Sequence, residues 1–379
     1  MDLSETLDQR PRTFQERSYT FNSLDLRRGG KLGPVTISYS TWGKLNEAKD
    51  NAILIPCGTT STTLVYDEED PDGDKGWWNI IIGPGRPLDP TRFFIICPNA
   101  LGGCYGSTGP SSINPATQQP YGMDFPLITV HDIVETQRRL IEHLGIQCLE
   151  MVIGNSFGGQ QALEWAVAYP DLMKKTVVMG ATDSMHALGM AWTEIGRQII
   201  KIDPRWQNGN YALSDEKPLA GLAVSQMLAL TTYFCEEMLE KRFGREITLD
   251  LVVPTPSATE DMGERFMVEN YLYYVGGSIA SRFDANSYLY LSRAANIFNL
   301  SDGYASLEET LSRIKSRIFF LGSSSDILFP AAHVRRLTEK TQACGVDARY
   351  WELQTPRGHY AFLVEGEQIR EALWSFMEI

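Results

Sequence analysis

Long apolar runs are missing from this sequence. None of its uninterrupted apolar stretches approaches the roughly 18 to 20 residues that a membrane span requires. The polar N-terminus also lacks the apolar segment of a signal peptide, so we expect a cytoplasmic protein with no membrane partner. Basic residues are in the minority: 34 of them against 47 acidic residues give a formal net charge of −13. That charge disfavours nucleic acid as the main partner.

Paired cysteines and metal-binding histidines are also missing. The six cysteines form no CxxC pair, and a chain of 379 residues needs no disulfides for stability. Reduced, buried side chains are therefore their simplest interpretation. The five histidines show no metal-ligand spacing, and no nucleotide-binding motif is present. We therefore expect neither a metal nor a cofactor.

Short, almost continuous apolar segments recur along the sequence. They are typical of strands buried on both faces of a parallel sheet, and the expected strands are 51–56, 92–97, 149–154, 175–181, 316–322 and 348–353. Helices are expected at 130–145, 157–169 and 365–377. Gln137 is the only polar residue on the apolar stripe of the first helix. The alternation predicts an α/β fold with a doubly wound, mostly parallel sheet.

The alternation of strands and helices stops after residue 181 and resumes near residue 317. Residues 184–306 are rich in Met, Trp and Tyr at helical spacing, which predicts a helical insertion. Ligands bind at the C-terminal edge of such sheets, and we expect the insertion to cover that edge as a lid. The expected organisation is a core in two parts, residues 1–183 and 307–379, interrupted by the lid.

A serine flanked by glycines follows one of the expected strands. The strand LEMVIG leads into Gly154-Asn155-Ser156-Phe157-Gly158, and a helical segment comes next. Such a turn strains the serine backbone and leaves no room for side chains at either glycine. The helix N-terminus offers unpaired N–H groups to a developing oxyanion. This G-x-S-x-G turn between strand and helix predicts the α/β-hydrolase fold, with Ser156 as its nucleophile.

A serine nucleophile needs a base that is itself oriented by a carboxylate. In this fold the order along the chain is Ser, then Asp or Glu, then His, so only His333 and His359 lie late enough. His359 follows the last expected strand and is the predicted base, whereas His333 falls in an expected surface helix. Asp326 follows the expected strand 316–322 and is the predicted acid.

An oxyanion needs two N–H donors. The expected donors are the backbone N–H groups of Phe157, directly after the nucleophile, and of Thr59, in the loop after strand 51–56. Cys57 in the same loop is a weaker candidate for a second nucleophile because no basic residue adjoins it in the sequence.

Beyond these residues, the sequence resembles the homoserine O-acetyltransferases and their relatives. The resemblance runs from about Val35 to the C-terminus and rests on the elbow, on DILFP and GHYAFL, and on segments 76–89, 97–115, 124–134, 242–246 and 282–294. It implies an α/β-hydrolase fold with a helical lid and a homodimer formed through lid helices. Its triad would be Ser156, Asp326 and His359, in agreement with the residues chosen above.

Two charged positions of that family are replaced in this chain. Phe234 stands where an arginine is expected to bind the amino acid's carboxylate, and Tyr360 where an aspartate is expected to meet its ammonium. A hydrogen bond to a charged group is worth about 1.5–3 kcal/mol. The two losses therefore favour a substrate pocket for a small uncharged alcohol, bordered by Phe234 and Tyr360. The alternative is that another cation of the lid, Arg197 or Arg282, supplies the charge of the missing arginine.

These replacements lead to three hypotheses for the function. The first is a serine carboxylesterase that hydrolyses small acetate esters such as ethyl acetate, because the pattern matches the homoserine-transacetylase-like esterases. The second is transfer of an acyl group from acetyl-CoA to homoserine or another hydroxyl acceptor, through the same acyl-enzyme. The third is a binding protein that keeps the fold without catalysis.

Overall fold

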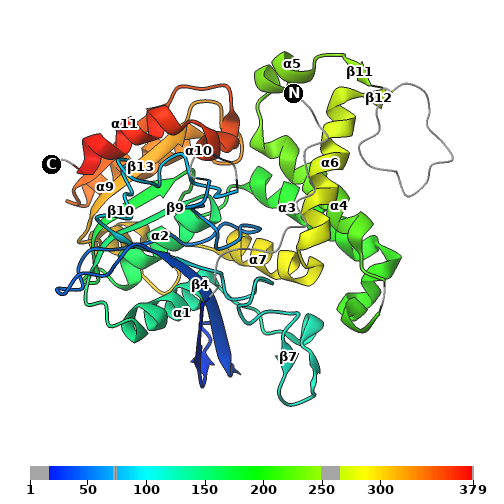
Figure 1. The fold of residues 1–379 in the computed structure, drawn as a ribbon, viewed down its shortest axis with the longest axis horizontal. Helices are drawn as coiled ribbons and strands as arrows, with labels where there is room; N and C mark the ends of the chain where they lie inside the picture. The colour runs from blue at the N-terminus through cyan, green and yellow to red at the C-terminus, as the bar shows by residue number, and fades with distance from the viewer. Residues whose placement is uncertain (1–16, 71–72, 74, 215, 249–264, 378–379) are drawn as a thin grey trace.

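A computed structural model describes residues 17–377, except 71–72, 74, 215 and 249–264. Its largest sheet consists of β1 (Arg17–Phe21), β4 (Val35–Trp42), β5 (Ala52–Leu54), β6 (Phe94–Pro98), β9 (Leu149–Asn155), β10 (Met173–Met179), β13 (Arg317–Ser323) and β14 (Ala348–Leu353). The spatial order is β1-β4-β6-β5-β9-β10-β13-β14 (Figure 1). The pairs β1–β4 and β4–β6 are antiparallel, and the others are parallel. The expected mostly parallel sheet is confirmed.

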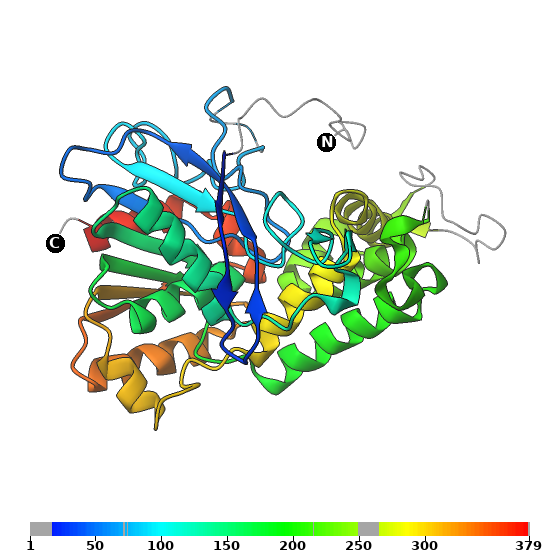
Figure 2. The ribbon, with the colours of Figure 1, turned by 90° about the horizontal axis from the view of Figure 1, so that it is seen from below.

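Both faces of the sheet are buried under helices (Figure 2). The helices that pack on it include α1 (Val130–His143), α2 (Phe157–Ala168), α9 (Ala331–Ala343) and α11 (Gly366–Met377). In β13, Phe320 packs into the cluster that contains α1, α2 and α9. Its neighbours Phe319 and Leu321 pack into the other cluster, with α11. Because successive strand residues point to opposite faces, burial of both faces explains the almost continuous apolar segments.

The strand β4 was not among those expected from the sequence. It contains two buried serines, Ser38 and Ser40, which interrupt the apolar pattern. The loops beside β4 supply hydrogen-bond partners: Ser40 Oγ donates to Thr63 Oγ1 at 2.9 Å, and the backbone N–H of Ser38 donates to Ser107 Oγ at 3.1 Å. The serines are therefore compatible with a buried strand, although their polarity hides it in the sequence.

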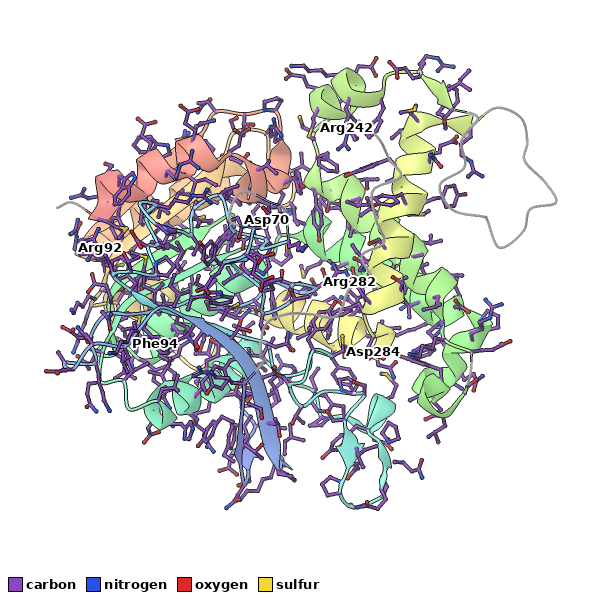
Figure 3. All side chains as sticks on the ribbon, viewed as in Figure 1. Asp70, Arg92, Phe94, Arg242, Arg282 and Asp284 are labelled. Carbon is purple, nitrogen blue, oxygen red and sulfur yellow. The ribbon has the colours of Figure 1, made fainter. Side chains whose placement is uncertain are left out.

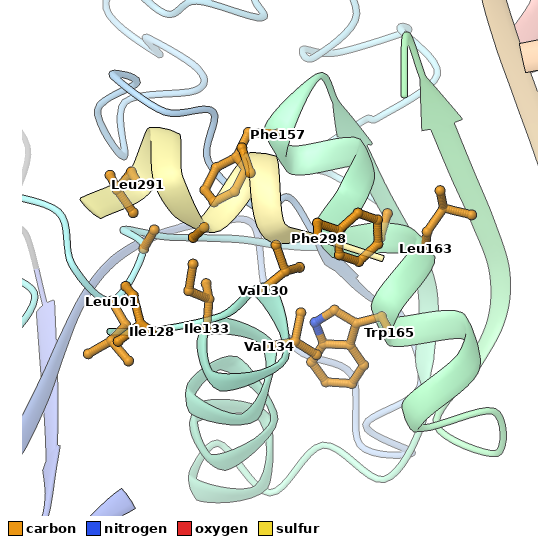
Figure 4. Close-up of a cluster of buried hydrophobic side chains, with 14 of the residues drawn as sticks. Leu101, Ile128, Val130, Ile133, Val134, Phe157, Leu163, Trp165, Leu291 and Phe298 are labelled. Atoms are coloured by element: carbon orange, nitrogen blue, oxygen red, sulfur yellow. The ribbon is translucent and has the colours of Figure 1, made fainter. Parts of the chain in front are cut away.

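The chain between β10 and β13 is mainly helical, with α3 (Ala187–Ile202), α4 (Leu219–Tyr233), α5 (Glu236–Phe243), α6 (Met267–Arg282) and α7 (Ala285–Ile297). α4 packs against α3 and α6 beside the sheet (Figure 1). In α7, Leu291 packs with Phe157 and Leu101 in the cluster on the sheet (Figure 4). Residues of α3, α4 and α6 belong to the same cluster. The helical stretch therefore shares the main core, and the role of residues 184–306 as a lid over the edge of the sheet stays a prediction.

The polar residue on the apolar stripe of α1 belongs to a buried network. Trp165 Nε1 donates to Gln137 Oε1 at 2.8 Å, and Gln137 Nε2 donates to Gln161 Oε1 at 2.7 Å. Gln161 Nε2 in turn donates to the carbonyls of Cys57 and Phe157, at 2.9 and 3.0 Å. Gln137 therefore connects the core to the backbone next to Ser156.

Replacing Gln137 with Leu is expected to destabilise the protein strongly. The Trp165 N–H and Gln161 Oε1 would stay buried without partners, at about 1–3 kcal/mol each. Urea unfolding should therefore show a free energy of unfolding lower by about 2–6 kcal/mol. Glu142→Leu, on the exposed part of α1 where Glu142 pairs with Arg138 at 3.0 Å, should change it by less than about 1 kcal/mol. Equal small losses would contradict the network's role.

Candidate active site

Ser156 lies in a strained turn between β9 and α2. Its backbone has φ +55° and ψ −123°, a conformation that costs a residue other than glycine about 1–3 kcal/mol. Its N–H donates to the Met179 carbonyl at 2.9 Å. A Cβ at Gly154 would lie 2.2 Å from the Gly158 oxygen, and a Cβ at Gly158 would lie 2.5 Å from the Pro56 oxygen. Both glycines are therefore required by the close backbone, as expected.

Asp326 and His359 are brought together by two neighbouring strands. Asp326 follows β13, and His359 lies in the short helix η4 (Gly358–Tyr360) after β14. His359 Nδ1 and Asp326 Oδ2 are 2.7 Å apart, in buried surroundings. Asp326 Oδ1 accepts from the N–H groups of Leu328 and Phe329 at 2.8 and 2.9 Å. An ionised carboxylate only accepts, so the proton belongs on Nδ1 and Nε2 is left as the acceptor.

The ring of His359 lies close to the end of β10. A Cβ at Gly180 would come within 3.1 Å of His359 Cε1, and the preceding residue, Met179, accepts from the N–H of Ser156. His359 Nε2 is buried and has no hydrogen-bond partner in the described part of the chain. The ring is held among the aromatic side chains of Tyr233, Phe329 and Phe362, with centroids 5.5–5.8 Å away. The imidazole is thus fixed beside the elbow with a free basic nitrogen.

The two residues expected to supply the oxyanion donors border one cavity with the nucleophile. Thr59, Phe157 and Ser156 all line it. Gln161 ties the start of α2 to the loop through the Cys57 carbonyl. Phe157 directly follows Ser156, the N-cap residue of α2, where backbone N–H groups have no partner within the helix. The donor roles of Thr59 and Phe157 are consistent with this placement and stay predictions.

Arg282 supports the loop from the other side. This exposed residue ends α6 (Figure 3). Its Nη1 donates to the Thr60 carbonyl at 3.2 Å and to the Tyr105 hydroxyl at 2.6 Å. Arg282 is not among the described residues that border the cavity. Its contacts therefore favour a role in positioning the loop rather than in binding a substrate's charge.

The cavity beside Ser156 holds about 690 Å³ of empty space, part of it open to solvent. Apolar groups supply much of its wall, from Met185, Trp192, Leu228, Ala229, Ala295, Leu328 and Phe329. The described residues on its wall include neither Phe234 nor Tyr360. Their rings pack edge to face against each other, 5.3 Å apart, and Phe234 is buried. The neighbouring Tyr233 borders the cavity, so a role for Phe234 and Tyr360 in the substrate pocket stays a prediction.

Other polar groups surround the cavity. Gln160, which the sequence did not single out, is fully buried on its wall. Its N–H donates to the Ser156 carbonyl at 3.1 Å, one helical turn back. The sequence feature that could have identified Gln160 is its position four residues after Ser156, because residues at this spacing lie on one side of a helix. Arg197, one of the two cations considered from the sequence, is also buried, with its Nη1 3.5 Å from Ser292 Oγ on the cavity wall.

Cys57 and His333 lie away from the predicted chemistry. Cys57 is fully buried, with its sulfur 3.4 Å from the sulfur of Cys97, and it is not among the described residues that border the cavity. Burial and the neighbouring Cys57 raise the pKa of the Cys97 thiol. His333 lies in α9 with its ring 5.6 Å from that of His186. These positions favour Ser156 and His359 over both alternatives.

No group of three or more His, Cys, Asp or Glu side chains among the described residues could hold a metal ion. No helix in the described ranges is long and apolar enough to cross a membrane.

Comparisons with known proteins agree with this architecture. The family described as the alpha/beta hydrolase fold matches residues 53–365. A homoserine O-acetyltransferase of Carboxydothermus hydrogenoformans is 42% identical over 96% of this chain and 95% of its own. A solved homoserine O-acetyltransferase from Bacillus anthracis superposes with a TM-score of 0.86 at 26% identity, covering 96% of this chain and 98% of its own. The solved structure of esterase E22 superposes with a TM-score of 0.83 at 29% identity, covering 95% of this chain and 99% of its own.

The chain belongs to the α/β-hydrolase fold family, in the group of homoserine O-acetyltransferases and their relatives. The expectation of an esterase for ethyl acetate is wrong. It is overturned by the relatives named homoserine O-acetyltransferase, which are 40–43% identical over more than nine tenths of this chain.

Proposed function

We propose that this protein transfers an acetyl group from acetyl-CoA to the hydroxyl group of homoserine. The observation that carries the proposal is the 42% identity, over almost the whole chain, with a protein named homoserine O-acetyltransferase. The arrangement around Ser156 supports it, because acyl transfer needs a nucleophile, an oriented base and oxyanion donors. Acetyl-CoA and homoserine are thus the proposed small-molecule partners.

In the first half-reaction, Ser156 Oγ attacks the thioester carbonyl while His359 Nε2 takes its proton. Asp326, 2.7 Å from Nδ1, keeps the imidazole in the correct tautomer and stabilises the imidazolium. The N–H groups of Thr59 and Phe157 bind the oxyanion. The carbon–sulfur bond then breaks, and the imidazolium returns its proton to the sulfur of the leaving CoA. Ser156 is left as its acetyl ester.

In the second half-reaction, the acceptor's hydroxyl loses its proton to His359 Nε2 and attacks the acetyl carbonyl. The bond from that carbonyl to Ser156 Oγ breaks, and the imidazolium returns the proton to the serine. Water can follow the same route, so transfer requires the acceptor to occupy the site in its place. The apolar side chains on the cavity wall, Leu228, Leu328 and Phe329 among them, help to exclude water.

The direct test follows CoA release from acetyl-CoA by purified protein, with and without homoserine. Homoserine is expected to raise the rate at least about tenfold, with O-acetylhomoserine as the product, because its hydroxyl replaces water in the second step. Parallel double-reciprocal plots are expected for an acyl-enzyme route. Ser156→Ala should lose at least about 10³-fold of the rate. A rate independent of homoserine would contradict the proposal.

We also propose that the protein forms a homodimer through the lid helices. Large apolar side chains are exposed along α3 and α4: Leu188, Met190, Ile195, Ile202, Leu219 and Val224. Exposed apolar groups gathered in this way favour a protein interface. Ile195→Glu on α3 is therefore expected to shift the protein toward monomer in sedimentation velocity. Ile113→Glu, at a similarly exposed isoleucine outside the lid helices, is the control. A wild-type monomer, or equal effects, would contradict the proposed interface.

A further inference from the structure

Gln160, on the cavity wall, carries a buried side-chain oxygen without a donor among the described residues. The side chain of Gln160 is fully buried, and its Nε2 donates to the Ala295 carbonyl at 3.3 Å. Because that carbonyl can only accept, the nitrogen must face it, and the orientation of the amide is set. Gln160 Oε1 then has no hydrogen-bond partner among the described residues. A buried acceptor left unpaired costs about 1–3 kcal/mol, which a ligand that donates a hydrogen bond would recover.

A second polar group on the wall is formed by hydroxyls near Arg197. Ser225 Oγ is buried and interacts with the hydroxyl of Tyr288. When Tyr288 is the donor of that pair, the O–H of Ser225 can donate to a ligand. A Cβ at Gly196 would lie 2.9 Å from Ser225 Oγ and 3.6 Å from Tyr288 Oη. The absence of a side chain at Gly196 therefore lets both hydroxyls approach α3. Ser225, Tyr288 and Ser292 all border the cavity.

The charge behind these hydroxyls comes from Arg197. The Nε and Nη2 of Arg197 donate to the Glu194 carboxylate, at 3.1 and 2.6 Å. The Nη1 of Arg197 is directed toward Ser292 Oγ at 3.5 Å. Glu194 is about half exposed, with 48% of its side-chain surface accessible, whereas the side chain of Arg197 is 5% accessible. Water screens the carboxylate more than the guanidinium, so the buried side of the pair keeps a positive potential.

We propose that this wall recognises the α-amino-acid end of the acceptor, with Gln160 Oε1 accepting from its ammonium group. The hydroxyl of Ser225 donates to its carboxylate, and Arg197 stabilises that charge from behind. The proposal rests on the proposed function and assigns the recognition of both charges to residues other than Phe234 and Tyr360. Gln160 and Ser225 are thus specificity-determining residues, and Arg197 is a positioning residue.

The test compares three acceptors in CoA release from acetyl-CoA. They are homoserine, 4-hydroxybutanoate, which lacks the ammonium, and 3-aminopropan-1-ol, which lacks the carboxylate. Gln160→Leu is expected to lower kcat/KM for homoserine about 10- to 100-fold, and for 4-hydroxybutanoate by less than about threefold. Ser225→Ala should lower kcat/KM about tenfold for homoserine and much less for 3-aminopropan-1-ol, which has no carboxylate to bind. Gln160→Glu, which keeps an acceptor oxygen, should restore the preference for homoserine.

A structural defect would give a different pattern. It would lower kcat/KM for all three acceptors by the same factor, and this result in Gln160→Leu would overturn the proposal. Gln119→Leu, the same substitution at an exposed position that does not border the cavity, is the matched control and should change none of the three values. Thermal unfolding of each variant checks that it folds.

A binding measurement separates this site from the proposed function. If wild-type protein releases CoA with none of the acceptors, the proposed function fails. The site is then judged by whether homoserine raises the Tm of Ser156→Ala protein. A rise that Gln160→Leu abolishes supports the site, and no rise overturns it.

Discussion

The strained turn at Ser156 is the constraint on which the rest of the site depends. A serine held at φ +55° would relax unless its surroundings fixed it. β9 and β10 hold it from one side through the Met179 carbonyl. The α2 helix and the loop after β5 hold it from the other, because Gly158 lets the chain approach Pro56 and Gln161 bonds the Cys57 carbonyl. Core packing through Gln137 and Trp165 thus extends to the nucleophile.

The same arrangement serves hydrolysis and transfer, which explains why esterases and acetyltransferases both occur among the structures that superpose on this chain. The two reactions share an acyl-enzyme and differ in what attacks it. In the proposed mechanism the outcome is decided away from the triad, on the cavity wall that we propose receives the acceptor. In this chain that wall combines apolar side chains with the unpaired Oε1 of Gln160 and the hydroxyl of Ser225, a combination suited to an acceptor that is polar at one end.

Much of the architecture could be predicted from the sequence. Strands such as β9 and β13 are buried on both faces, so their sequences are almost continuously apolar. The proximity of Asp326 and His359 followed from their order along the chain and is seen at 2.7 Å. β4 was missed because Ser38 and Ser40 interrupt its apolar pattern. Their hydrogen-bond partners lie in distant loops, which the sequence does not place beside the strand. The esterase inference rested on two replaced positions, Phe234 and Tyr360, and is contradicted by relatives named homoserine O-acetyltransferase that are similar over almost the whole chain. Gln160 was missed because its unpaired oxygen becomes visible only when α7 supplies the Ala295 carbonyl.

The most direct test of the central claim is mass spectrometry of the protein shortly after mixing with acetyl-CoA. The proposed route predicts one added acetyl group, located on Ser156 by peptide mapping. That group should disappear faster when homoserine is added than in buffer alone, because the acceptor's hydroxyl competes with water. An acetyl group on another residue, no acetyl group, or a decay that homoserine does not change would contradict acyl transfer through Ser156.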